Sequence, residues 1–191
     1  MSARLVIMGP QGSGKGTQAA RLAAHLGVPA ISTGDIFRAN ISGGTPLGRL
    51  AQEYTARGEL VPDSVTNDMV RDRLAEPDAA DGFILDGFPR NAAQVGALDE
   101  ILDGLGSRLD AVVQLTAERG ELMTRMRKRA ELEGREDDTE EVIARRLDIY
   151  DAQTAPLADS YEQRGLLVSV DGIGDVDEVA ERLLGALSTL V

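Results

Sequence analysis

The stretch that decides the fold is Leu5-Val6-Ile7-Met8-Gly9-Pro10-Gln11-Gly12-Ser13-Gly14-Lys15-Gly16-Thr17. An apolar run breaks here into a glycine-rich turn, and the Ala- and Leu-rich segment 18–26 that follows is typical of a helix. A strand, a glycine turn and a helix in this order predict a phosphate-binding loop, because successive backbone N–H groups can point at one place and the helix adds its positive end. Lys15 supplies a mobile positive charge for the outer phosphates. Four glycines and a lysine at this spacing are poorly explained as an ordinary glycine turn.

The motif departs from the general pattern at one position. G-x-x-x-x-G-K-[ST] matches at Gly9, Gly14 and Lys15, but the next residue is Gly16 and the hydroxyl residue, Thr17, comes one position late. A direct bond from this hydroxyl to Mg²⁺ is therefore a weaker expectation than in a typical P-loop nucleotide hydrolase.

Composition limits the possible partners. The chain has 191 residues, 42% of them hydrophobic, with a formal net charge of −12 and no cysteine. This length fits one α/β domain with one or two inserted segments. The negative charge disfavours nucleic acids and anionic membranes, so an anionic substrate must be met by local cations. Disulfides and thiolate metal sites are excluded. No apolar run reaches membrane-spanning length and no signal peptide is evident, so we expect a cytoplasmic protein.

Further apolar segments alternate with helical ones along the chain. With the run at 5–8, strands are expected at 30–32, 82–86, 111–115 and 166–171. This alternation indicates an α/β fold in which a five-stranded parallel sheet is covered by helices on both faces. The strand exits at 9–17, 33–34, 86–90 and 172–174 should surround one crevice, because ligands bind at the carboxyl ends of parallel strands.

The expected helices are separated by glycine, proline and polar segments. A long helix from 139 to about 164 should be kinked or broken at Pro156, and the polar segment 131–138 is expected to be an exposed flap. The other expected helices lie at about 35–40, 46–57, 62–74, 91–103, from 122 onward, and 176–187.

Asp86 is the candidate acid for a metal. It ends the apolar run 83–85 and precedes the glycine turn at Gly87. A carboxylate at the carboxyl end of a strand beside a phosphate loop is placed to reach Mg²⁺ through water. The alternative is that Asp86 only terminates the strand.

Arginines on segments that face the expected crevice point to more than one phosphate. Any single surface arginine is usually only solvated. Several guanidinium groups around one crevice of a strongly acidic chain indicate that several phosphates are held at once. These residues are Arg38, Arg90, Arg129, Arg135 and Arg146.

Four motifs, in order and over the whole chain, resemble those of adenylate kinases. They are Gly-Pro-Gln-Gly-Ser-Gly-Lys-Gly-Thr-Gln (9–18), Ile-Ser-Thr-Gly-Asp (31–35), Asp-Gly-Phe-Pro-Arg (86–90) with Gln94, and Arg-Glu-Asp-Asp-Thr (135–139). The resemblance implies a P-loop core with two mobile parts, a small helical AMP-binding insertion at 32–61 and a short lid at 128–138. Relatives with a long lid can carry a zinc site made mainly of cysteines. This chain has neither the length nor the cysteines for such a lid, so it resembles the short-lid form, without zinc.

The resemblance also implies an activity and the residues that carry it. The expected reaction is reversible, Mg²⁺-dependent phosphoryl transfer, ATP + AMP = 2 ADP, by a monomer. ATP would be bound by Gly12, Ser13, Gly14, Lys15, Gly16, Thr17, Arg129 and Gly174. AMP would be bound by Thr33, Gly34, Arg38, Glu59, Leu60, Val61, Gly87, Phe88, Pro89, Arg90, Gln94, Arg135 and Arg146. The catalytic cations would be Lys15, Arg90, Arg129, Arg135 and Arg146.

This chemistry needs no base, because the attacking oxygen of a nucleoside monophosphate is already anionic and catalysis is positioning and charge neutralisation. Two alternatives remain open. A UMP/CMP kinase has the same fold, but its relatives tend to have alanine and asparagine where Thr33 and Gln94 stand. A nucleotide-dependent switch would leave the segment 86–90 unexplained.

Overall fold

The fold is built on one parallel sheet. A computed structural model describes residues 3–133 and 139–188. The strands lie in the order β2-β3-β1-β4-β5, and every neighbouring pair is parallel. This confirms the predicted five-stranded parallel sheet. The strands are β1 (Arg4–Met8), β2 (Ala30–Ser32), β3 (Phe83–Asp86), β4 (Ala111–Thr116) and β5 (Leu167–Asp171).

Helices connect the strands and extend beyond them. Within the two described ranges, none is both long and apolar enough to cross a membrane. They are α1 (Lys15–Leu26), α2 (Thr33–Ser42), α3 (Pro46–Thr55), α4 (Asp63–Leu74), a 3₁₀ turn η1 (Pro77–Ala79), α5 (Ala92–Gly104), α6 (Arg119–Glu133), α7 (Glu140–Ile149), a π-helical turn η2 (Tyr150–Thr154), α8 (Leu157–Gln163) and α9 (Val176–Leu187).

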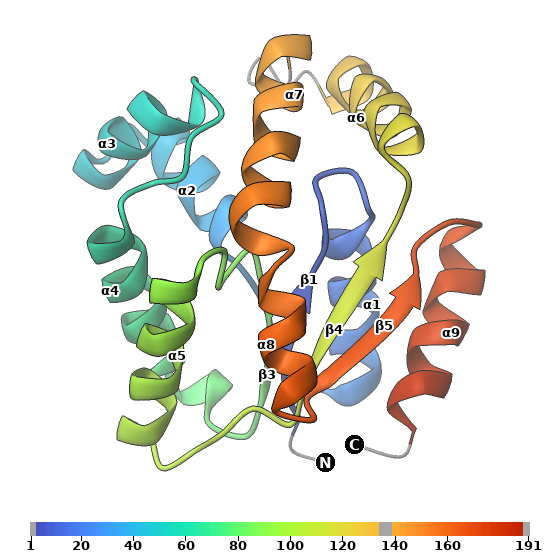
Figure 1. The fold of residues 1–191 in the computed structure, drawn as a ribbon. Coiled ribbons are helices and arrows are strands. Elements are labelled where there is room, and N and C mark those ends of the chain that lie inside the picture. The colour runs from blue at the N-terminus through green and yellow to red at the C-terminus, as the bar shows by residue number, and fades with distance from the viewer. Residues whose placement is uncertain (1–2, 134–138, 189–191) are drawn as a thin grey trace.

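Alternating side chains of β1 supply the two halves of the core. Leu5 and Ile7 are buried in a cluster with residues of α1 and α9 on one face of the sheet. Val6 and Met8 are buried on the other face, in a cluster with residues of α4, α5 and α8. Figure 1 shows these two helical layers on either side of the strands. Because both faces are covered, the strands read as continuous apolar runs.

Two groups of helices stand beyond the carboxyl ends of the strands (Figure 1). Helices α2 and α3 have a small apolar cluster of their own, centred on Phe37, Ala51 and Val61. Helices α6 and α7 pack through a second cluster formed by Leu122, Met126, Ile143 and Leu147. The strand exits beneath them are thereby enclosed between separately packed helical groups.

The structure differs from the sequence-based expectation in two places. Helix α6 continues to Glu133, so the first part of the segment 131–138, expected to be a flap, is helical. The long helix expected from 139 does begin at its predicted cap, because the Thr139 hydroxyl accepts a hydrogen bond from the Val142 N–H at 3.3 Å. Its break comes earlier than Pro156, at η2, where the Ala155 N–H bonds the Tyr150 carbonyl at 2.8 Å. Proline has no N–H to continue the ladder, so the widened turn precedes it.

The crossing of α2 and α3 should not tolerate a side chain at Gly48. A Cβ built there would lie 2.0 Å from the Asn40 carbonyl oxygen. Gly48→Ala should therefore force the helices apart and lower the free energy of unfolding by about 1–3 kcal/mol or more. The matched control is Gly185→Ala, at an exposed position of α9, where a Cβ meets nothing within 4 Å and a gain of about 0.5–1 kcal/mol is expected. Denaturant unfolding of both variants checks this, and equal stabilities would contradict the close crossing.

Candidate active site

The glycine loop leads into a helix whose start has no side-chain cap. Helix α1 begins at Lys15 after Gly14, which has φ 91°. The turn is closed by a hydrogen bond from the Ser13 N–H to the Pro10 carbonyl at 3.1 Å. No described side chain accepts a hydrogen bond at this helix start, and its first turn holds no acidic residue. The free N–H groups and the positive end of α1 therefore form a site suited to an anion.

Gly12 lets α6 approach the loop. Its φ is +83°, and a Cβ there would lie 3.0 Å from both the Leu122 carbonyl oxygen and the Met126 Cγ. Helix α6 also carries Arg125 and Arg129. The contact of α6 with the loop therefore brings two arginines to the side of the phosphate site.

Asp86 lies where the metal hypothesis requires a carboxylate. It ends β3, which pairs with β1 just before the loop, and Asp86 is in register with Ile7. Its Oδ2 would be 3.7 Å from a Cβ built on Gly16, so the carboxylate lies over the start of α1. Within the described ranges, no three His, Cys, Asp or Glu residues gather in a group that could hold a metal ion. Asp86 is therefore a carboxylate that a cation beside the phosphate site could meet.

A cavity of about 720 Å³ opens beside the loop, between the sheet and helices α2, α3 and α7. Most of the residues expected to bind the acceptor nucleotide line it together with Lys15. These are Thr33, Gly34, Arg38, Glu59, Leu60, Val61, Gly87, Phe88, Pro89, Arg90, Gln94 and Arg146. The remaining predicted residue, Arg135, lies outside the described residues.

Several positive groups lie close together beside this cavity. Burial lowers the pKa of Lys15 to about 8; Asp86 opposes this shift, while Arg90, Arg129 and Arg38 add to it. Burial likewise lowers the pKa of the Arg90 guanidinium, with Asp86 again opposing. Like charges held together out of water are unfavourable. An anion bound among these groups would therefore be stabilised.

The segment after β3 is held by a hydrogen-bond network. The Arg90 Nε donates to the Gly87 carbonyl at 2.8 Å, and its backbone N–H donates to the Gln94 Oε1 at 2.8 Å. The Thr154 hydroxyl of η2 donates to the Arg90 carbonyl at 2.6 Å. Thr33 closes the other side, since a Cβ on Gly87 would lie 2.5 Å from its Oγ1. Arg90 is therefore fixed before any ligand binds.

Two other predicted residues already have ionic partners. Arg38 pairs with Asp35 at 2.5 Å, within the first turns of α2. The Glu59 carboxylate pairs with Arg57 at 3.1 Å and with Arg145 of α7 at 2.5 Å. The carboxylate of Glu59 thus links the α3 side of the cavity to α7.

The loop after β5 does not line this cavity, contrary to the expectation of a single crevice. Gly174 is exposed, with φ 126°, and lies on the other side of the phosphate loop, beside α1 and α9. Gln18 of α1 donates to the Val176 carbonyl at 2.9 Å, which ties the two together. The strand exits therefore form two neighbouring sites that share the loop, because α1 and the loop stand between them.

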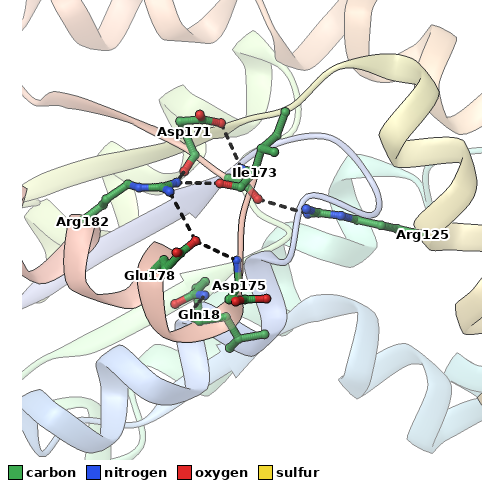
Figure 2. Close-up of polar contacts among 9 residues, drawn as sticks. Gln18, Arg125, Asp171, Ile173, Asp175, Glu178 and Arg182 are labelled. Carbon is green, nitrogen blue, oxygen red and sulfur yellow. Dashed lines mark hydrogen bonds and ion pairs between the residues drawn. The ribbon is translucent and has the colours of Figure 1, made fainter.

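Sequence reasoning missed the residues that support this second site. Figure 2 shows Arg125 of α6 and Arg182 of α9 reaching the β5 exit from opposite sides. Arg125 donates to the Gly172 carbonyl at 3.1 Å, and Arg182 donates to the carbonyls of Asp171 and Ile173 at 2.9 and 2.7 Å. No motif marks either arginine. Arg125 belongs to a cluster of basic residues with Arg127, Lys128 and Arg129, and Arg182 lies on an amphipathic helix, and neither setting predicts a contact with the β5 exit.

Comparison with known proteins agrees with this geometry. The family model described as adenylate kinase matches residues 7–166. The chain belongs to the adenylate kinase family. This confirms the resemblance found in the motifs, and it makes the chain a phosphotransferase whose acceptor is a phosphate group.

Several adenylate kinases are similar to this chain over nearly their whole length. The protein from Kocuria rhizophila is 60% identical over 184 residues, covering 96% of this chain and 98% of the relative. The one from Bifidobacterium longum is 61% identical over 184 residues, covering 96% and 99%. The adenylate kinase of a Nocardioides species is 58% identical over 187 residues, covering 98% of both.

The depressed pKa of Lys15 predicts a stability effect with a definite sign. Its pKa is about 8 in the folded protein and about 10.4 in an unfolded chain, so the buried charge destabilises the fold below pH 8. This penalty disappears as the pH rises from 8 toward 10. Lys15→Met should therefore raise the melting temperature at pH 7, with a gain that shrinks toward pH 10. Thermal unfolding of both proteins across this range is the measurement, and a less stable variant at pH 7 would contradict it.

Proposed function

We propose that this chain catalyses reversible transfer of a phosphoryl group from ATP to AMP, giving two ADP. The observation that carries the proposal is the convergence of Lys15, Arg38, Arg90 and Arg146 on one cavity of a chain with net charge −12. The phosphates of two nucleotides meeting end to end would supply negative charge that such a cluster can bind.

In this proposal the phosphate loop and the β5 exit bind ATP. Gly12 to Thr17 surround its outer phosphates with backbone N–H groups, and Lys15 and Arg129 add positive charge. The uncapped start of α1 supports this role. Gly174 meets the adenine through its backbone, on a loop whose carbonyls are already held by Arg125 and Arg182 (Figure 2).

AMP would occupy the cavity between the sheet and helices α2, α3 and α7. Arg38 and Arg90 would hold its phosphate, and Gln94 would meet the edge of its base. The remaining contacts would come from the cavity walls at Thr33, Gly34, 59–61 and 87–89, which all line the same space. The acceptor phosphate would thereby lie on the Lys15 side of the cavity.

The transfer itself would need only positioned cations. An anionic phosphate oxygen attacks the terminal phosphorus of ATP in line, and Lys15, Arg90, Arg129, Arg135 and Arg146 would neutralise the charge on the moving group. Fixed donors are effective here because they need no reorganisation as charge develops. We propose that the insertion 32–61 and the lid 128–138 close over the substrates and exclude water, which would otherwise accept the phosphoryl group.

We propose that magnesium enters this site bound to ATP. A bound Mg²⁺ would supply positive charge that offsets the negative charge of the ATP phosphates. Asp86 is the residue that would hold its water shell, because its carboxylate lies over the start of α1. We further propose that the protein acts as a cytoplasmic monomer.

An acceptor panel tests the proposal against its rivals. We expect ADP formation from ATP with AMP, little activity with UMP or CMP, and negligible ATP hydrolysis without an acceptor. Gln94→Leu removes the amide from the base edge, at a cost of roughly 1–3 kcal/mol. The apparent KM for AMP should therefore rise about fivefold or more, while that for ATP changes little. Equal losses for both nucleotides would place Gln94 elsewhere, and acceptor-independent hydrolysis would favour a switch protein.

The proposed catalytic roles of Arg135 and Arg146 can be tested by measuring kcat. Arginines supplied to a transferring phosphoryl group contribute roughly 10³–10⁵ in rate in related enzymes, so Arg146→Ala and Arg135→Ala should each lower kcat at least about a hundredfold. The matched control is Arg71→Ala, which breaks only an exposed ion pair with Asp68 and should leave kcat unchanged. Steady-state kinetics of the three variants is the measurement. An unaffected Arg135 variant would show that its segment does not reach the phosphates.

A further inference from the structure

We infer that Asp63 determines the base specificity of the acceptor site by fixing the orientation of the Gln94 side-chain amide. The inference rests on the proposed placement of Gln94 against the base of AMP. Asp63 is the first residue of α4 and does not itself line the described cavity. Its role would therefore be to position Gln94 from behind.

The Gln94 amide is held at both ends. The side chain is only 2% exposed. Its Nε2 donates to the Asp63 Oδ1 at 2.8 Å, and its Oε1 accepts from the Arg90 backbone N–H at 2.8 Å. The same Asp63 oxygen accepts from the Asn91 Nδ2 at 2.9 Å, which holds the carboxylate in place. Two segments far apart in sequence, the start of α4 and residues 90–94, thus meet at one amide.

These partners allow only one orientation of the amide. An ionised carboxylate can only accept hydrogen bonds, and a backbone N–H can only donate. A rotation of Gln94 by 180° would place its oxygen against Asp63 and its NH₂ against the Arg90 N–H, so both contacts would become repulsive. The cost is high because the amide is buried and water cannot replace the lost bonds.

The fixed amide retains one donor and one acceptor for a ligand. An amide NH₂ carries two hydrogens and its oxygen accepts two bonds, so each end keeps one free valence. Adenine matches this pair, since its N1 accepts and its N6 amino group donates. Hypoxanthine, guanine and uracil present the opposite order, a ring N–H beside a carbonyl oxygen. They would require the rotated amide that Asp63 prevents, whereas cytosine offers the same order as adenine.

A purely structural role for Asp63 predicts a different outcome. Asp63 also links the start of α4 to Asn91, the N-cap of α5, so its loss could simply loosen this corner. Loosening would weaken AMP and IMP alike and lower the melting temperature. Loss of the orientation lock instead changes the ratio between these two acceptors, because IMP gains access to the rotated amide.

The experiment uses the full-length protein with saturating ATP and either AMP or IMP as acceptor. For Asp63→Ala we expect the AMP/IMP ratio of kcat/KM to fall at least about tenfold. The KM for AMP should rise roughly five- to hundredfold, and the KM for ATP should change less than about twofold. Asp63→Asn keeps an acceptor oxygen at this position and should restore most of the ratio. Ser64→Ala, at the exposed neighbouring position of α4, is the matched control and should match the parent protein.

Each outcome has a separate meaning. An unchanged AMP/IMP ratio in a folded Asp63→Ala protein overturns the inference. If Gln94→Leu also leaves the KM for AMP unchanged, the placement of Gln94 in the proposed function fails first. If Asp63→Ala does not fold, Asp63→Ser takes its place, because its hydroxyl is one bond shorter than the carboxylate and cannot hold both amides. The same fall in the ratio is expected for it, and an unchanged ratio again overturns the inference.

Discussion

The burial of positive groups beside the phosphate site is the constraint on which the rest of this structure depends. Desolvation lowers the pKa of Lys15 to about 8; Asp86 opposes this shift and neighbouring arginines add to it. Desolvation lowers the pKa of Arg90 as well. Because holding these groups together out of water is unfavourable, an anion bound among them would be stabilised.

The apolar core on both faces of the sheet offsets the unfavourable burial of these cations. Both faces of β1 are buried in large clusters, so the strand exits are rigid supports for the loop and for Asp86. The helices beyond the sheet contribute smaller clusters of their own. The two large apolar clusters therefore lie against the sheet beneath the phosphate loop, and the two small ones lie within the helices around it.

Local patterns in the sequence predicted the parts of the site that lie on single segments. The phosphate loop, Asp86 and the turn after it follow from short motifs whose backbone geometry is determined locally. Contacts between segments were not predictable in this way. Asp63 and Gln94 are 31 positions apart, and Arg125 and Arg182 reach the β5 exit from two different helices. Nothing in the periodicity of those helices distinguishes these arginines from solvated ones.

The two-site arrangement was missed for the same kind of reason. Parallel topology correctly predicted that all strand exits lie at one edge of the sheet. It did not show that the loop and α1 would divide that edge, because the division depends on how far the loop projects. The Gln18 contact to the Val176 carbonyl is the physical sign of this division.

The π-helical turn η2 lies between α7 and α8 and determines how far one helix is rotated about its axis relative to the other. Each residue of an α-helix advances by about 100°, and a π turn accommodates one residue more than an α turn. Val142 is buried in α7, and Arg146 one turn later lines the cavity. From η2 onward the buried positions are Thr154, Leu157, Ala158 and Tyr161. Arg146 of α7 lines the nucleotide cavity, whereas Leu157 and Tyr161 of α8 belong to the core against the sheet. Deletion of one residue in η2 would turn α8 by about 100° relative to α7, so that Arg146 could not stay in the cavity wall while Tyr161 stays in the core.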